Sequence, residues 1–309
     1  MENMLSDFKI ELKELSFYKQ KSTNRKIIFG RSRNGVLFRG EFQGKKHAIK
    51  KILFAENNEE TIKLEIVKQI KLIHPNLLKI LAWTEDSEAI FLVIEYFSGV
   101  DLKEYLKTNQ SNINVSNKLE ILIQVADTLE YLHRLNTPII HNEIKTQNVL
   151  ISKDGKKLRL VDFLLNKDIK DTVNTSKEPN WSPAYLPPEL LNNMNNQNGP
   201  GPSNPSSNEP TTFSDVYQFG MLVYEVLSGD SPFEKETIKD NIFNYICKGG
   251  RPNLKILGKD VPSDLIKLIK SCWSQKAGAR PKISEIKQEL EKINEKVKIS
   301  NVKSKIYKE

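Results

Sequence analysis

The apolar spacing of this chain changes near residue 98, and that change constrains the fold more than any other feature. From residue 26 to residue 97 apolar residues fall in short β-type runs, among them VLFRGEF, HAIKKILF and AIFLVIEYF, with one helical stretch at residues 61–73. After Ser98 apolar residues recur at i, i+3, i+4 and i+7, the spacing of amphipathic helices. The sequence therefore predicts an α+β fold, with a small antiparallel β-sheet and one helix before a larger, mainly helical half. Length alone allows one two-lobed domain or two small domains.

The segments outside these patterns suggest how the chain is divided. The polar start of the chain has a helix-like spacing of Leu5, Phe8, Leu12 and Leu15, and the stretch NNMNNQNGPGPSNPSSNEPTT has almost nothing to bury. A β-hairpin is expected at residues 149–161, with its turn at Lys153-Asp154-Gly155. The expected divisions are an N-terminal extension (1–26), one domain (27–290, with lobes 27–97 and 98–290 and a disordered insert at 192–212) and a basic C-terminal tail (291–309).

Composition narrows the class of protein. The 309 residues carry a formal net charge of +8, but acidic and basic residues are interspersed, as on an ordinary solvated surface, so we expect no nucleic-acid partner. No apolar run approaches the roughly 18 residues that cross a bilayer, and we expect no membrane span. Two cysteines make neither a disulfide framework nor a four-ligand zinc site, so we expect a reducing, cytoplasmic location.

Two short segments of the β-rich half could bind phosphate. In FGRSRNGVLFRG, Gly30 and Gly35 lie where a turn could bring backbone amides close to phosphate oxygens, although glycine in a hairpin is more often a plain turn residue. In HAIKK, Lys50 follows the small residue Ala48, and Glu65 lies on the next helix. A buried lysine needs a carboxylate partner, but taken separately each of the two is more often a surface residue.

The order and spacing of motifs from Ile28 to Pro281 resemble the protein kinase family. The glycine-rich loop, the Lys50 strand and the Glu65 helix are followed by HPNLL, LVIEYF, HNEIKTQNVL, VDFLL, YLPPEL and SDVYQFGMLVYEVLSG. The late motif CWSQKAGARP resembles the tyrosine-kinase-like group, most of whose members phosphorylate Ser and Thr. The resemblance thus implies the two-lobed kinase fold, ATP and Mg²⁺ as cofactors, and a protein substrate or signalling partner.

The resemblance also implies a role for individual residues. Lys50 would hold the α and β phosphates and Glu65 would fix Lys50, although a purely structural ion pair is the plainer alternative. Asn148 and Asp162 would bind magnesium, and Lys145 would accompany Glu143 in catalysis. The remaining positions would surround adenine (Leu37, Ala48, Ile94, Glu95, Phe97 and Leu150), cover phosphates (Gly30 and Gly35) or keep the structure (His141, Phe163, Ser182, Glu189, Asp215 and Arg280).

Three positions depart clearly from the family pattern, and a fourth departs more mildly. The triad His-Arg-Asp reads His141-Asn142-Glu143, so the expected base is one methylene longer and the arginine that often pairs with an activation-segment phosphate is absent. We therefore expect that phosphorylation of Thr172, Thr175 or Ser176 does not activate the domain through this arginine. Leu164 replaces the glycine of Asp-Phe-Gly, which removes backbone freedom, and Gln69 is polar where the family packs an apolar residue.

Two hypotheses remain open on the sequence alone. The first is an active but slow Ser/Thr protein kinase that uses Glu143 as a displaced base. The second is a pseudokinase that binds nucleotide and acts as a signalling scaffold or switch. The sequence predicts neither the physiological substrate nor the oligomeric state.

Overall fold

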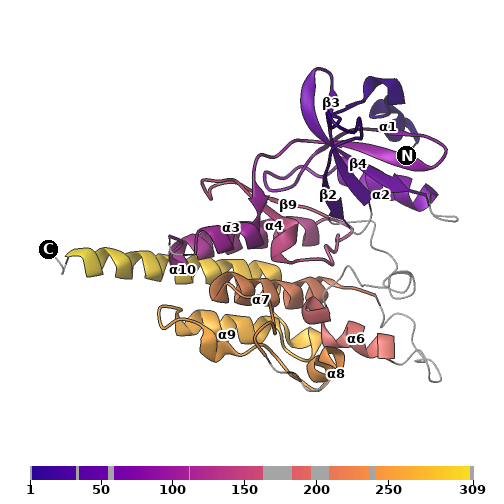
Figure 1. Cartoon of the computed structure of the whole chain (residues 1–309). Coiled ribbons are helices and arrows are strands. Elements are labelled where there is room, and N and C mark those ends of the chain that lie inside the picture. The colour runs from indigo at the N-terminus through magenta and orange to yellow at the C-terminus, as the bar shows by residue number, and fades with distance from the viewer. Residues whose placement is uncertain are drawn as a thin grey trace. The chain divides into compact units, whose positions relative to one another are not determined.

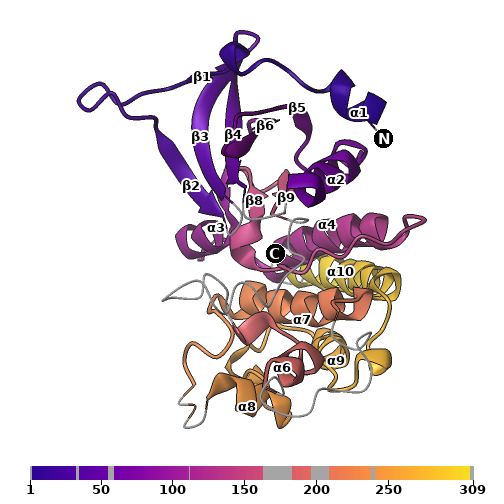
Figure 2. The same cartoon turned by 90° about the vertical axis from the view of Figure 1, so that its right-hand side faces the viewer.

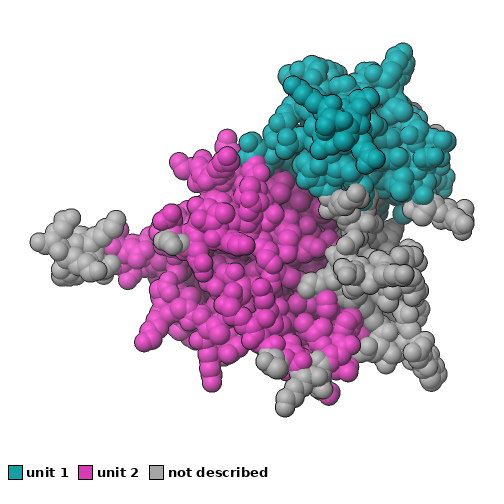
Figure 3. Space-filling view, in the orientation of Figure 1, with its two compact units in different colours: residues 1–98, 164–168 teal, residues 99–163, 169–309 magenta. Residues whose placement is uncertain are grey.

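The computed structural model describes residues 2–32, 35–54, 59–110, 112–162, 183–195, 209–236, 238 and 241–306. The chain divides into two compact units (Figure 3). The first contains residues 1–98, and the described residues from Gly99 onward belong to the second.

The first unit is built on an antiparallel sheet. The strand order is β1-β3-β4-β6-β5, and β2 pairs with the first half of β3 (Figure 2). The strands are β1 (Ser16–Phe17), β2 (Ile28–Ser32), β3 (Gly35–Phe42), β4 (Lys45–Leu53), β5 (Ile80–Glu85) and β6 (Ala89–Ile94). Helix α2 (Glu59–Ile70) begins and ends two to three residues before the stretch that the spacing predicts.

Side chains alternate between the two faces of this sheet, and each face buries its own apolar cluster. One cluster contains Ile49, Phe91 and Val93. The other contains Ile52, Trp83 and Leu92, together with Ile62 and Ile66 of α2. Helix α2 therefore covers the face to which Lys50 belongs, because Lys50 and Ile52 are two residues apart on β4.

The N-terminal residues belong to the first unit and do not form one long helix. Helix α1 (Glu2–Asp7) stops after fewer than two turns, and Lys9 then pairs with Trp83 of β5 as an isolated parallel bridge. Leu15 is buried in the cluster of Ile49, while Leu12 is exposed. Pairing with the open edge of β5 supplies backbone hydrogen bonds that a helix would otherwise make internally, and this explains the break.

The second unit is mainly helical, with a small sheet of order β7-β8-β9 (Figure 1). Its strands are β7 (Val100–Asp101), β8 (Val149–Ile151) and β9 (Leu158–Leu160), and the last two form the predicted hairpin. Its longer helices are α3 (Leu102–Thr108), α4 (Val115–His133), α6 (Pro188–Asn195), α7 (Thr212–Ser228), α8 (Ile242–Cys247), α9 (Ser263–Cys272) and α10 (Ile283–Ile306).

Helix α7 is the centre of this unit because it is apolar on nearly all sides and buried along its length. A capping box of Thr211 and Ser214 begins it, and Gly229 ends it in the left-handed conformation at φ 78°. Gly220 permits close packing on α9, since a Cβ at this position would lie 2.8 Å from Cys272 Cβ. The helix is thus held firmly at both ends and on its packed face.

Two expected divisions fall inside helices. The expected boundary at residue 290 lies within α10, where Ile293 and Asn294 are still buried and Ser116 donates to Asn294 Oδ1 at 2.8 Å. The expected disordered insert overlaps the end of α6 and the start of α7, and its residues 196–208 lie outside the described residues. Among the described helices, none has the length and apolar character needed to cross a bilayer.

Candidate functional site

Asp215 of α7 holds the loop of residues 141–148 in place by hydrogen bonds. Asp215 is fully buried, and its two carboxylate oxygens accept the backbone N–H groups of His141 at 2.9 Å and Asn142 at 2.8 Å. The structure thus brings together the loop and the residue expected to anchor it. Asn142 has φ 63°, a left-handed conformation that asparagine tolerates better than most residues.

Two further side chains support this arrangement, Gln218 by bonding the loop and His133 by contacting Asp215, and sequence reasoning missed them. Gln218, one turn after Asp215, accepts the N–H of Ile144 at 2.9 Å and donates to the carbonyl of Asn142 at 3.0 Å. His133 Nε2 lies 2.8 Å from Asp215 Oδ2. A polar residue within an otherwise apolar helix was the available signal for Gln218, because buried polar groups are nearly always hydrogen-bonded.

Glu143, Lys145 and Asn148 come together on this loop. The Glu143 carboxylate oxygen Oε2 lies 3.5 Å from Lys145 Nζ and 3.2 Å from Asn148 Nδ2. Asn148 Nδ2 also donates to the Glu143 carbonyl at 2.9 Å. Since both contacts use the amide nitrogen of Asn148, the amide is oriented, and no donor among the described residues reaches its Oδ1.

The β8–β9 hairpin places Asp162 beside Asn148. Asn148 directly precedes β8, Val149 pairs with Leu160 of β9, and the N–H of Val161 donates to the Asn148 carbonyl at 3.0 Å. Asp162 follows with φ 60°, another left-handed residue. The carboxylate and amide side chains of these two residues offer oxygen atoms, the hard donors that Mg²⁺ prefers.

His141, the first residue of the loop, is fully buried. Burial lowers the pKa of its imidazole below the ordinary value, although the charges of Asp215, Glu143 and Asp162 oppose that shift. Its Nδ1 accepts the N–H of Glu143 at 3.2 Å, which requires the tautomer with the proton on Nε2. His141 therefore supports the backbone of the residue expected to act as base.

In the first unit, four predicted residues share one face of the sheet. Leu37 is opposite Lys50, Ala48 is opposite Ile94, and Ala48 and Lys50 are two residues apart on β4. Lys50 is buried among them. Glu95 follows Ile94, and its N–H donates to the Lys79 carbonyl at 3.0 Å.

The two glycines of the β2–β3 hairpin differ. A Cβ at Gly35 would lie 2.2 Å from the Lys51 carbonyl oxygen, so only glycine fits this close approach of two strands. At Gly30 a Cβ would meet Leu37 at an ordinary 3.6 Å. The structural demand for glycine is therefore at Gly35.

Glu65 lies buried on α2, and its Oε1 accepts from Lys68 Nζ at 2.8 Å. Lys68 is a contact that the sequence did not suggest. The pairing of Glu65 with Lys50 stays a prediction.

Glu189 and Arg280 form a bidentate ion pair in the second unit. Arg280 Nη1 and Nη2 donate to the two carboxylate oxygens at 2.6 and 2.7 Å, and the Arg280 side chain is fully buried. The guanidinium also donates to the carbonyls of Ser274 and Phe213.

Of the other predicted residues, Leu150 lies on β8, Phe97 follows β6, and Phe163, Leu164, Thr172, Thr175, Ser176 and Ser182 lie outside the described residues.

The sequence profile of the family described as "Protein tyrosine and serine/threonine kinase" matches residues 24–290. The chain belongs to the protein kinase family. The expected fold class is thereby confirmed, with the antiparallel sheet in the first unit and the helices in the second.

Several serine/threonine kinases are similar to this kinase domain. The chain is 27% identical to the serine/threonine-protein kinase VIK of Arabidopsis thaliana, over 94% of this chain and 63% of that protein. It is 28% identical to the Raf homolog serine/threonine-protein kinase of Caenorhabditis elegans, over 84% of this chain and 31% of that protein. It is 29% identical to a putative serine/threonine-protein kinase/receptor of Acanthamoeba polyphaga mimivirus, over 84% of this chain and 15% of that protein. The chain thus spans less than two thirds of the length of these relatives.

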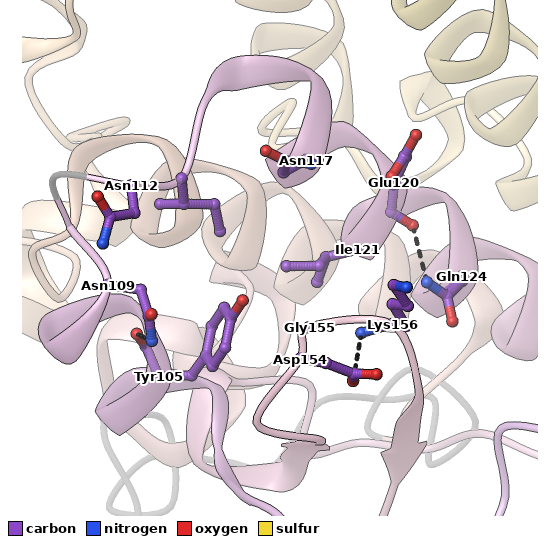
Figure 4. Close-up of a pocket in the computed structure, with 11 residues that line it drawn as sticks. Tyr105, Asn109, Asn112, Asn117, Glu120, Ile121, Gln124, Asp154, Gly155 and Lys156 are labelled. Carbon is purple, nitrogen blue, oxygen red and sulfur yellow. Dashed lines mark hydrogen bonds between the residues drawn. The ribbon is translucent and has the colours of Figure 1, made fainter.

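The kinase also has a cavity in its second unit that contains none of the predicted site residues. It has a volume of about 400 Å³ and lies between α3, the start of α4 and the β8–β9 turn (Figure 4). Its lining is mostly polar, with Tyr105, Asn112, Asn117 and Lys156 around the apolar Ile121. The cavity is distinct from the loop of residues 141–148.

Proposed function

We propose that this chain is an ATP-dependent protein kinase that transfers the γ-phosphate to Ser or Thr of a protein substrate. The observation that carries the proposal is the position of the Glu143 carboxylate, 3.5 Å from Lys145 Nζ and 3.2 Å from Asn148 Nδ2. A carboxylate base, a cation and a metal-binding amide are the groups that phosphoryl transfer requires at the reacting end of ATP.

In this proposal the residues of the second unit perform the chemistry. The substrate hydroxyl oxygen attacks the γ-phosphorus while the bond from that phosphorus to the departing ADP oxygen breaks. Glu143 takes the hydroxyl proton, and Lys145 neutralises charge that develops on the phosphoryl oxygens. Asn148 and Asp162 would hold Mg²⁺, which supplies charge neutralisation of the phosphates when bound.

Residues of the first unit bind the nucleotide in this proposal. Lys50 contacts the α and β phosphates, and Glu65 orients it. Leu37, Ala48 and Ile94, which share one face of the sheet, offer the adenine ring an apolar surface. The serine/threonine kinases that match most of this chain support the choice of Ser and Thr over Tyr.

We expect a slow enzyme because Glu143 is longer than the aspartate of the family. A misplacement of about 1 Å at a reacting group can cost about 10²-fold in rate, or about 2.7 kcal/mol of barrier. The hydrogen bonds that the loop backbone donates to Asp215 and Gln218 fix the loop, so its backbone does not move to compensate for the added methylene.

A second candidate is a pseudokinase that binds nucleotide as a signalling scaffold or switch. The contact between Glu143 Oε2 and Asn148 Nδ2 favours it, because a base engaged by the metal-binding amide is a weaker acceptor for the substrate proton. The uncharged Asn142 favours it as well.

Transfer of radioactive phosphate from ATP to a generic protein substrate separates the two candidates. The purified chain is compared with Lys50→Met, and the kinase proposal predicts a signal above that variant. A signal equal to that variant would eliminate the enzyme. Thermal unfolding with and without millimolar Mg-ATP tests binding separately, since ligand at 100 times Kd stabilises by about 2.7 kcal/mol.

A further inference from the structure

Residues 5–10 add a short parallel segment to the open edge of the first unit's sheet. The N–H of Trp83 donates to the Phe8 carbonyl at 2.9 Å, and the N–H of Ile10 donates to the Trp83 carbonyl at 3.0 Å. The indole Nε1 of Trp83 donates to the Leu5 carbonyl at 2.9 Å. Because β5 is the last strand of the sheet, these bonds cover an edge that would otherwise be unpaired.

The same segment packs against α2. Leu5 and Phe8 join the apolar cluster that contains Ile62 and Ile66 of α2 and Trp83 of β5. Helix α1 contacts α2 directly, and both lie at the β5 side of the sheet (Figure 2). The segment therefore touches the helix and the sheet at once.

Glu85 of β5 forms ion pairs with both the N-terminal segment and α2. One carboxylate oxygen lies 2.7 Å from Lys9 Nζ, and the other lies 2.7 Å from Lys63 Nζ of α2. Partial burial alone would raise the pKa of Glu85, but hydrogen bonds from Lys63 and Lys9 hold it below the ordinary value. Both ammonium groups also lie over the Trp83 ring, at 4.9 and 5.8 Å from its centroid.

These contacts bear on the nucleotide site because α2 carries Glu65 and β4 carries Lys50. Ile62 and Ile66, which the segment helps to bury, lie one turn before and one residue after Glu65. Any shift of α2 along the sheet would move Glu65 relative to Lys50. We infer that residues 5–10, docked on Trp83 and Glu85, are a positioning element that fixes α2 and thereby sets the affinity for the phosphates of ATP. The inference rests on the proposed nucleotide-binding function.

A matched pair of proline variants of the full chain tests the inference. Ile10→Pro removes the N–H that donates to Trp83, whereas Leu12→Pro places proline at the first residue of the 3₁₀ turn Leu12–Glu14, where it is tolerated. Both variants replace one apolar residue with proline, Ile10 within residues 5–10 and Leu12 just after them. Hydrogen exchange is measured for the α2 amides, with the α7 amides as an internal reference, and affinity is measured for Mg-ATP and for adenosine.

In Ile10→Pro we expect α2 amides to exchange about tenfold faster while α7 is unchanged. Affinity for Mg-ATP should fall about tenfold, with adenosine affinity changed by less than about twofold, because adenosine lacks the phosphates that Lys50 contacts. Leu12→Pro should match the wild type in all measurements. The ratio of the two affinities is the decisive value, since general loss of stability would lower both together.

Three results would overturn the inference: unchanged α2 exchange in Ile10→Pro, an unchanged ratio of ATP to adenosine affinity, or equal effects of the two prolines. A wild-type chain that binds no Mg-ATP would instead refute the proposed function. Exchange at α2 would still be measurable in that case, so the two failures are distinct.

Discussion

The loop of residues 141–148 and helix α2 are held in place by different kinds of interaction. The loop is fixed by buried hydrogen bonds from its backbone to Asp215 and Gln218, neither of which is more than 1% exposed. Helix α2 is held by apolar packing and by the ion pair of Lys63, which remains partly in solvent, with Glu85 of β5. Buried hydrogen bonds fix a geometry and tolerate no missing partner, whereas exposed ion pairs contribute little and allow adjustment.

The largest expected effect comes from removing the anchor of the loop. Asp215→Ala leaves the N–H groups of His141 and Asn142 buried without an acceptor, at a cost of about 1–3 kcal/mol each. We expect the free energy of unfolding to fall by about 4 kcal/mol in urea titrations. Asp264→Ala, which removes a carboxylate paired with surface lysines, is the control and should lose less than about 1 kcal/mol. Similar losses in both variants would erase the contrast between buried and exposed polar contacts.

The buried ion pair of the second unit should come next. Glu189→Ala leaves the fully buried Arg280 guanidinium without its carboxylate, and we expect a loss of about 3 kcal/mol in unfolding free energy. The double variant Glu189→Ala with Arg280→Met removes the stranded charge and should be more stable than Glu189→Ala alone. A double variant that is less stable would show that the carbonyl contacts of Arg280, not its charge pairing, dominate.

Glu143→Asp tests whether the backbone of the loop is rigid. Because the backbone is fixed, shortening the side chain should move the carboxylate directly, and turnover should rise by up to about 10²-fold, equivalent to about 2.7 kcal/mol. Steady-state phosphate transfer measures this, and Glu143→Gln, which keeps the size but not the basicity, should be inactive. Equal turnover of the aspartate variant and the wild type would indicate that the loop adapts to the longer side chain.

Apolar spacing predicted most strands and helices but not the short strands β1 and β7, and short motifs supplied the residues proposed for the candidate site. Lys145, Asn148 and Asp215 could be found because each belongs to a short motif with fixed spacing. Gln218, His133 and Lys68 could not, because their roles depend on which residues face them across the fold. The helix-like spacing of Leu5 to Leu15 was misleading, since the open edge of β5 offers hydrogen bonds that local sequence does not reveal.

Acidification should lower the free energy of unfolding through His141. Burial lowers the pKa of this histidine in the folded state, so the unfolded chain binds more protons below its ordinary pKa of about 6.5. Its contribution is therefore present above pH 6.5 and is lost as pH falls, with a slope of up to about 1.4 kcal/mol per pH unit. Burial raises the pKa of Glu225, and this changes the free energy of unfolding with pH in the opposite direction. The informative quantity is therefore the difference in pH dependence between the wild type and His141→Gln. We expect that variant to lose the steeper part of the decline in urea titrations between about pH 7 and pH 5. Equal slopes would mean that His141 is protonated without penalty.

The smallest expected effect belongs to the ion pairs of α2. Lys63→Met removes the ion pairs with Glu59 and Glu85 and the ammonium over the Trp83 ring but keeps an unbranched apolar side chain, so the free energy of unfolding should fall by about 0.5 kcal/mol. Because the side chain is partly exposed, the loss should be smaller still when sodium chloride is raised from about 0.05 to 0.5 M. The comparison of Ile10→Pro with Lys63→Met then separates the backbone hydrogen bonds of the N-terminal segment from the charges around it. A loss above about 2 kcal/mol for Lys63→Met would show that charge, and not apolar packing, holds α2 on the sheet, and the contrast with the loop would no longer hold.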